Sequence, residues 1–598
     1  MKINRQKVGR VLRVQYFQAI PEILKYQVIT KAVLYLIVLV LGALAQWAIR
    51  STGRVAIVSN DYTFLFTTWQ GIVLLAMGLA VLMFYVALDL NAQVYLSSNI
   101  ILQNDDTVFR SIRQSIASMV RFTRPNGILV VLYMALVAPI VGTGLSISLT
   151  SDLYVPSFIK SVIRETPLYL WTYNILVVVL AIVGIMNIFL LHGIMLDDLS
   201  VHRASRRSMR LLRENWRDFL KETLMFTVRY VLFSIAILFL LFAVPMNTVG
   251  HFSRGNDFSR FLLIYFSLIG LIVSTLISFL WTPIYILKLT QMYYSYSYLE
   301  EEKVILPASD YRPDRFLIRF TAAFLVLLMV LAEGMNVYFD ELFPRKIGTE
   351  VIAHRAGGSE GHENTIAGLE TAIAAGIYGA EIDVQRTADG YYVAVHDTDF
   401  SRLLGDKRRV RDMSFREVRS LRLYATEEDP GEQVPALGEL LACAKDRILL
   451  FVELKGATAD RQMADDVVDI IRNMGMTDQA VILSLKYDLI DYIETNYPEM
   501  QTGFLSWATY GNKGALNCDF VALEEESATF RTILSIHYQG KKVLVWTPND
   551  EEEQQYCLCS RADAMITDNI SQALRLTEEL ESRSDIDRML DAILGSMF

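Results

Sequence analysis

Residues 379–397 read GAEIDVQRTADGYYVAVHD, and they contain a strand in which apolar and acidic residues alternate. Ile382 and Val384 read as buried, so Glu381 and Asp383 leave the opposite face of the strand together. Two anions side by side on a mostly apolar strand repel each other unless a positive group lies between them. The stretch therefore predicts a cationic partner facing this strand.

This strand is one of a series of short apolar runs from residue 349 onward. The runs lie at 351–354, 380–384, 391–397, 448–455, 480–485, 502–507, 519–524, 542–547 and 564–568. Amphipathic, helix-like stretches separate them, at 364–375, 436–445, 459–474, 486–496, 527–538 and 551–560. Such alternation favours a parallel sheet, most simply an α/β TIM-type barrel. Since a barrel needs eight strands, either 391–397 is a hairpin arm or the last run closes the ring as a stub.

The first part of the chain has a different composition. Residues 1–340 hold 30 Lys and Arg against 20 Asp and Glu, whereas residues 341–598 hold 26 against 45. The two parts thus carry net charges of +10 and −19, which together give the chain's −9. Apolar runs near 31–49, 64–88, 127–149, 170–196, 223–246, 261–287 and 316–338 are long enough, or nearly so, to cross a bilayer. We expect a membrane domain of about seven helices over 1–340 and a globular barrel over 341–598.

The distribution of basic residues predicts the orientation in the membrane. Lys and Arg concentrate in the N-terminal arm and in the second, fourth and sixth loops between the expected spans. These segments belong on the cytoplasmic side. With seven spans, the N-terminus is cytoplasmic and the globular part is extracellular. The seventh span, 316–338, is the weakest, and the extracellular location depends on it.

The polar residues of the globular part gather where its strands end. They are His354 and Arg355, Glu381 and Asp383, His396 and Asp397, Glu453 and Lys455, Trp546, and Asp568. In a barrel the C-terminal ends of the strands form one face, and that face holds the active site. We therefore expect these side chains to lie together.

The residue types in this set indicate a reaction class. The carboxylates of Glu381, Asp383 and Glu453 suit Mg²⁺ or Ca²⁺ better than zinc. Two cations suit an anionic substrate, and two histidines suit an acid and a base near neutral pH. Metal-assisted phosphoester cleavage uses all of these parts. The alternative is a structural network in which Arg355 and Lys455 pair with the carboxylates.

Several blocks of the globular part resemble the glycerophosphodiester phosphodiesterases. The blocks are HRAGGSEGHENT, GAEIDVQRTADGYYVAVHD, VPALGELL, FVELK, VWTPND and MITD, and the resemblance covers about residues 350–575. The first part is similar, more loosely, to the multi-span region of membrane-anchored bacterial members. The resemblance implies a TIM barrel that hydrolyses glycerophosphodiesters to glycerol 3-phosphate and an alcohol.

The resemblance also implies roles for individual residues. His354 and His396 resemble the family's acid/base pair. Glu381, Asp383 and Glu453 resemble the ligands of one divalent cation, Mg²⁺ or Ca²⁺. Arg355 and Lys455 resemble phosphate-binding cations and Trp546 a wall for the glycerol, while Glu363 and Asn364 resemble partners of the site. In the family a substrate hydroxyl is thought to attack phosphorus, giving a cyclic phosphate that water opens.

Two features depart from the family pattern. His362 stands where the family often has proline, so it is either a third imidazole at the site or an exposed loop residue. The basic segment 405–412 resembles the family's variable insertion. It either contacts an anionic polymer or lipid headgroups, or it is a solvated loop.

Substrates and partners follow from the same reading. The expected substrates are a soluble glycerophosphodiester, a lipid headgroup or a glycerol-phosphate polymer, with membrane lipids around the helices. Nucleic acid is not among the expected partners, and the oligomeric state is open. The alternative function is a lipid-handling or transport protein whose barrel only binds phosphodiesters.

Overall fold

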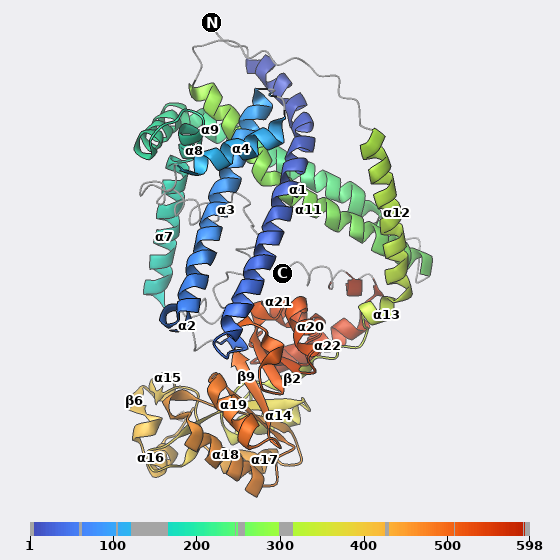
Figure 1. The fold of residues 1–598 in the computed structure, drawn as a ribbon. Coiled ribbons are helices and arrows are strands. Elements are labelled where there is room, and N and C mark those ends of the chain that lie inside the picture. Colours follow the sequence, from blue (N-terminus) through green and yellow to red (C-terminus); the bar gives the residue numbers. More distant parts are fainter. Residues whose placement is uncertain are drawn as a thin grey trace. The chain divides into compact units, whose positions relative to one another are not determined.

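A computed structural model shows the fold of the chain (Figure 1). It describes all residues except 1–4, 59–62, 103, 105, 121–165, 246, 249–256, 298–314, 425–429, 508, 586, 590 and 592–598. The chain forms two compact units. One comprises residues 1–44, 73–155 and 159–338, and the other comprises residues 45–72, 156–158 and 339–598.

The first unit is helical and carries long apolar segments. Its helices are α1 (Arg5–Arg50), α3 (Trp69–Ile101), α4 (Thr107–Ser118), α7 (Pro167–Met186), α8 (Leu190–Met195), α9 (Val201–Leu238), α11 (Asp257–Ser297) and α12 (Arg315–Val337). The C-terminal end of α1 and the N-terminal end of α3 belong to the other unit. Many of their large apolar side chains are exposed, among them Leu168, Trp171 and Val330. This is the pattern of helices that face lipid.

Four helical segments are long and apolar enough to cross a membrane. They are Ala19–Arg50, Pro167–Met195, Val201–Ala243 and Asp257–Ser297, and they correspond to four of the predicted spans. Two further predicted spans appear as shorter apolar helices, Trp69–Val81 and Thr321–Val337. The predicted span 127–149 lies outside the described residues. The count of seven therefore stays a prediction.

The second unit is built around a closed, parallel eight-stranded barrel. Its strands are β2 (Glu350–Ala353), β3 (Gly379–Arg386), β7 (Leu449–Leu454), β8 (Ala480–Ser484), β9 (Gln501–Ser506), β11 (Phe520–Glu524), β12 (Lys542–Trp546) and β13 (Ala564–Thr567). They pair in chain order, and the pairing of β13 with β2 and of β2 with β3 closes the ring. The predicted TIM-type barrel is confirmed.

Two apolar layers hold the barrel together. Alternate strand residues such as Ile352, Phe451 and Leu544 fill its interior. The opposite faces of the strands pack against α14 (Ile366–Ala374), α17 (Leu437–Ala444), α18 (Arg461–Asn473), α19 (Tyr487–Asn496), α20 (Phe530–His537), α21 (Glu551–Cys559) and α22 (Ile570–Ser582). The barrel strands and the helices α14 and α17–α21 lie where the sequence predicted them, whereas α22 was not among the predicted helices.

The apolar run 391–397, which is one more than a barrel of eight strands needs, is a hairpin arm. Strand β4 (Tyr392–Ala394) pairs antiparallel with the end of β3, so that Val384 lies opposite Ala394. This was one of the two outcomes open from the sequence. The chain then forms β5 (Asp399–Phe400), α15 (Ser401–Leu404), β6 (Asp406–Arg409) and α16 (Phe415–Ser420) around a small apolar cluster of their own before it reaches α17.

A segment from the first part of the chain completes the barrel unit. Among the described residues, β9 is followed by no α-helix, only by β10 (Tyr510–Gly511) and a single 3₁₀ turn. There β1 (Ala56–Ile57) pairs antiparallel with β10, and a Cβ atom at Gly511 would lie tightly against Ala56, at a φ of +119° that favours glycine. Ala56 and Val58 are buried in the same apolar layer as the barrel helices. Residues between two predicted membrane spans are therefore part of the barrel unit's core.

Candidate active site

The predicted site residues belong to the C-terminal ends of the barrel strands and the loops that follow. Glu381 and Asp383 are on β3, and Asp383 lies directly opposite Glu453 of β7. His354 and Arg355 follow β2, Lys455 follows β7, His396 follows β4, and Trp546 ends β12. The backbone amide of Val395 donates to the carbonyl of Asp383 at 2.9 Å, and this bond brings the β4 hairpin back to β3.

Three carboxylates form the centre of the site. Glu381, Asp383 and Glu453 are buried, and each offers an oxygen within 4.8 Å of the others. The Lys455 ammonium donates to Asp383 Oδ1 at 2.7 Å and to Glu453 Oε2 at 3.1 Å. Glu381 Oε1 and Glu453 Oε1 are buried and have no hydrogen-bond partner. The cluster thus combines one side-chain cation with two unused anionic oxygens.

The pKa values in the cluster move in opposite directions. Burial, reinforced by the Asp383 and Glu453 carboxylates, raises the pKa of Glu381 well above its usual value. Burial would also raise the pKa of Asp383, but Lys455 and the imidazoles of His396 and His354 bring that pKa below its usual value. Burial raises the pKa of Glu453 despite the attraction of Lys455.

The loop after β2 positions donors against these carboxylates. The Arg355 backbone amide donates to Glu381 Oε2 at 2.9 Å, and its guanidinium donates to Glu363 at 3.2 Å. Asn364 donates from Nδ2 to Asp383 Oδ2 at 2.9 Å and accepts from the Asp383 backbone amide at 3.0 Å. Arg355 and Asn364 both adopt positive φ, +50° and +55°, and such conformations collect at functional sites.

Each of the two histidines is held by a carboxylate. His354 Nδ1 lies 2.7 Å from Asp568 Oδ1, and His396 Nδ1 lies 2.8 Å from Asp397 Oδ1. Asn549 donates to the second oxygen of Asp568 at 2.7 Å. With Nδ1 engaged, Nε2 is the nitrogen that each ring can offer to a substrate. Burial lowers the pKa of His396, although its bond to Asp397 works in the opposite direction.

Some of these supporting residues had no role in the sequence prediction. Asp397 and Asp568 were noted as strand-end residues without a function, while Gln385 and Asn549 were not singled out. Gln385 donates to the carbonyls of Val395 and Asp397 at 2.8 and 2.7 Å and so fastens the hairpin that carries His396. The sequence contained one signal for the role of Asp397, because this residue directly follows His396 at the end of a predicted strand.

Three other features singled out in the sequence are His362, Trp546 and the basic segment 405–412, and each has a defined contact. His362 stacks on Tyr424 with ring centroids 4.2 Å apart, which makes it a packed loop residue. The indole nitrogen of Trp546 donates to the carbonyl of Ala522 at 3.2 Å, and its side chain is half-buried. The basic segment 405–412 forms β6 and the turn after it, where Arg408 pairs with Asp406.

Two protein-family models match the chain, one in each of its two parts. The family model described as the membrane domain of glycerophosphoryl diester phosphodiesterase matches residues 12–332, more than half of the chain. The model of the glycerophosphoryl diester phosphodiesterase family matches residues 354–572.

Individual relatives carry the same description. A glycerophosphodiester phosphodiesterase of Caldanaerobacter subterraneus subsp. tengcongensis is 25% identical over 239 residues, which are 39% of this chain and 98% of that protein. Glycerophosphodiester phosphodiesterase 1 of Mus musculus is 30% identical over 159 residues, 23% of this chain and 48% of that protein. A solved phosphodiesterase of Oleispira antarctica in complex with sn-glycerol-3-phosphate is 24% identical, with 38% of this chain and 96% of that chain covered and a TM-score of 0.36. Because one family model matches the membrane part and the other the barrel, the chain belongs to the glycerophosphodiester phosphodiesterases that carry a membrane domain.

Proposed function

We propose that the barrel hydrolyses glycerophosphodiesters to glycerol 3-phosphate and an alcohol with the help of one divalent cation. The observation that carries this proposal is the meeting of three carboxylates and two carboxylate-held histidines at one end of the barrel. A structural ion-pair network would not need two buried carboxylate oxygens without partners.

The acidic cluster fits a hard divalent cation such as Mg²⁺ or Ca²⁺. Glu381, Asp383 and Glu453 would hold it, since Glu381 Oε1 and Glu453 Oε1 have no other partner. When bound, such an ion neutralises negative charge on the phosphoryl oxygens and lowers the pKa of a hydroxyl group that it coordinates. Lys455 stays beside Asp383 and Glu453, and it adds a positive charge next to the phosphate.

The remaining steps fall to side chains of this chain. Arg355 can fork onto two phosphate oxygens and hold the diester in place. One of His354 and His396 removes the proton from the attacking hydroxyl, and the other protonates the departing alkoxide. Asp568 and Asp397 fix the ring orientations through Nδ1, so that proton transfer takes place at Nε2. Trp546 provides an apolar surface for the glycerol carbons at the same end of the barrel.

The test compares histidine variants in purified full-length protein. His354→Ala should reduce the release of glycerol 3-phosphate from glycerophosphocholine by at least about a thousandfold, since it removes acid/base catalysis. The matched control is His537→Ala, because His537 also pairs with an aspartate, Asp563, at 2.8 Å but lies beside the N-terminal end of β13. Glu381→Ala and EDTA should each abolish activity as well. Full activity in His354→Ala, or equal loss in both histidine variants, contradicts the proposed site.

The substrate class and the membrane orientation belong to the same proposal. The positive-inside distribution supports a cytoplasmic N-terminus and an extracellular barrel. Labelling of a cysteine added at the C-terminus by an impermeant reagent in intact cells tests this orientation. A panel of glycerophosphocholine, lysophospholipid, phosphatidylglycerol and a glycerol-phosphate polymer separates soluble, lipid and polymer substrates.

A further inference from the structure

The second half of helix α3 is polar and buried within the helical unit. Its exposed first half carries apolar residues such as Ile72 and Leu79. From residue 89 onward six polar side chains are buried within eleven positions: Asp89, Asn91, Gln93, Ser97, Ser98 and Asn99. Polar groups cost free energy when they are taken out of water, so a row of buried polar side chains needs partners to bind. This half of α3 is therefore the place to look for a ligand.

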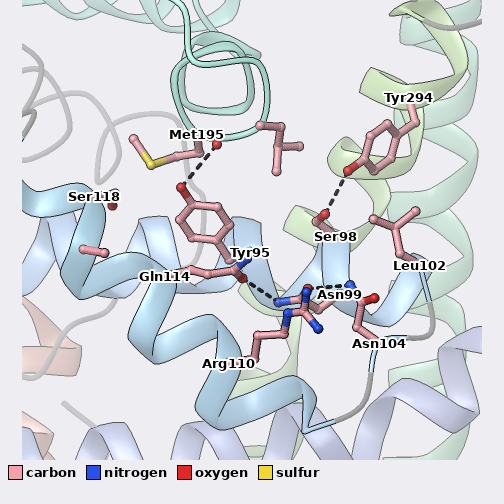
Figure 2. A pocket seen from close by; sticks show the side chains of 12 residues that line it. Tyr95, Ser98, Asn99, Leu102, Asn104, Arg110, Gln114, Ser118, Met195 and Tyr294 are labelled. Carbon is pink, nitrogen blue, oxygen red and sulfur yellow. Dashed lines mark hydrogen bonds between the residues drawn. The ribbon is translucent and has the colours of Figure 1, made fainter.

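A cavity of about 520 Å³ opens beside the end of this polar stretch. Helices α3, α4, α8 and α11 all contribute to its lining (Figure 2). The volume lies in the range of sites for small ligands, and a position between the helices of a bundle is a common one for such sites. Every lining residue belongs to the helical unit, so the cavity is separate from the barrel site.

Hydrogen bonds hold the polar lining in place. Asn99 donates to Gln114 Oε1 at 2.8 Å and to Ser111 Oγ at 2.9 Å, and it accepts from Asn104 at 2.8 Å. On the far side, Ser98 and Tyr294 are 2.8 Å apart, which ties α3 to α11. Figure 2 shows the bonds of Asn99 with Gln114 and Asn104 and the bond between Ser98 and Tyr294. A lining that is already ordered loses little conformational entropy when a ligand binds.

The charge of the lining favours an anion. Arg110 extends from α4 with Gln114 toward α3, and it is the lining's single charged residue (Figure 2). Among the residues that the structure describes, no carboxylate lines the cavity and none forms an ion pair with Arg110. A guanidinium presents a fork of donors that matches phosphate oxygens, and neighbouring amides and hydroxyls add further hydrogen bonds. Leu102, Met195 and Leu196 add apolar surface to the lining.

We propose that this cavity binds a phosphate ester, with the phosphate on Arg110 and the organic part against Leu102, Met195 and Leu196. Two sources present this chemistry: the headgroup of an anionic glycerophospholipid and a free glycerol phosphate. In either case the helical unit binds a ligand of its own in addition to holding the chain in the membrane. The proposal does not depend on catalysis by the barrel.

The experiment compares two arginines of helix α4 in purified, delipidated full-length protein. Arg110→Gln removes the charge from the cavity, whereas Arg113→Gln removes an equally exposed arginine of the same helix that does not line it. In one arm, native mass spectrometry measures retention of added phosphatidylglycerol. In the other arm, equilibrium dialysis measures binding of radiolabelled sn-glycerol 3-phosphate. Binding at the barrel is common to both variants, so their difference reports on the cavity.

Arg110→Gln should weaken binding about tenfold or more in one of the two arms, with Arg113→Gln close to the wild type. A loss in the lipid arm assigns the cavity to a lipid headgroup, and a loss in the soluble arm assigns it to a free ester. Phosphodiesterase activity and elution volume check that the variants are folded, and Arg110→Lys, which keeps the charge but not the fork, should be intermediate. Equal binding by both glutamine variants in both arms overturns the proposal.

Discussion

Asn364 gives a sharp quantitative test of the site, because two hydrogen bonds connect it to the buried Asp383. Replacing it by glycine keeps a backbone that adopts the observed φ of +55° and removes only the side chain. The Asp383 carboxylate then loses a hydrogen bond that contributes about 1.5–3 kcal/mol, and its backbone amide loses an acceptor at a cost of about 1–3 kcal/mol.

We therefore expect Asn364→Gly to destabilise the barrel by at least about 2.5 kcal/mol. For a unit of this size that corresponds to a fall in melting temperature of at least about 5–10 °C. Asn364→Ala should cost about 1 kcal/mol more, because alanine is strained at positive φ. Differential scanning calorimetry of the full-length protein measures both shifts.

The glycine variant also separates stability from activity. At 25 °C it should remain folded but lose phosphodiesterase activity, because Asp383 is no longer held in the orientation that its neighbours require. A melting temperature within 2 °C of the wild type, or an alanine variant more stable than the glycine variant, would refute the reasoning from these two bonds and this backbone conformation.

Three further outcomes are expected. Asp397→Asn replaces the carboxylate that raises the pKa of His396 by a neutral amide, so the limb of the kcat/KM profile that His396 controls should move to lower pH. Movement of the acid limb identifies His396 as the base, and movement of the alkaline limb identifies it as the acid. Because burial and its neighbours raise the pKa of Glu381, protons compete with the metal, and titration of EDTA-treated protein should show Mg²⁺ affinity that falls as the pH is lowered. Val58→Asp places a carboxylate in the outer layer of the barrel and should lower its melting temperature by roughly 5 °C or more, whereas Val55→Asp, at an exposed position of the same segment, should have almost no effect.

The sequence predicted the fold best where the same local pattern recurs from strand to strand. Each barrel strand is a short apolar run, and its C-terminal end faces the site, so the positions of Glu381 and Glu453 followed from their places in the runs. The parallel register of β3 and β7 then sets Asp383 opposite Glu453, a contact that the fold class requires but that neither strand reveals alone.

Contacts between segments far apart in the chain left no such pattern. Strands β1 and β10 have two residues each and are separated by more than 450 positions, too short for any periodicity to be read. The pairing of His354 with Asp568 also joins the first and last strands of the barrel, and Asp568 alone resembles a common helix cap. Such contacts depend on closure of the ring, which no local signal encodes.

The question posed by the alternating carboxylates of β3 has an answer in two parts. Lys455 supplies a cation from within the chain, but its bonds reach only Asp383 and Glu453, and Glu381 receives a single backbone amide. Burial and the neighbouring carboxylates of Asp383 and Glu453 therefore raise the pKa of Glu381. A divalent cation would offset the negative charge that Lys455 leaves and would use the two carboxylate oxygens for which the described residues provide no hydrogen-bond partner.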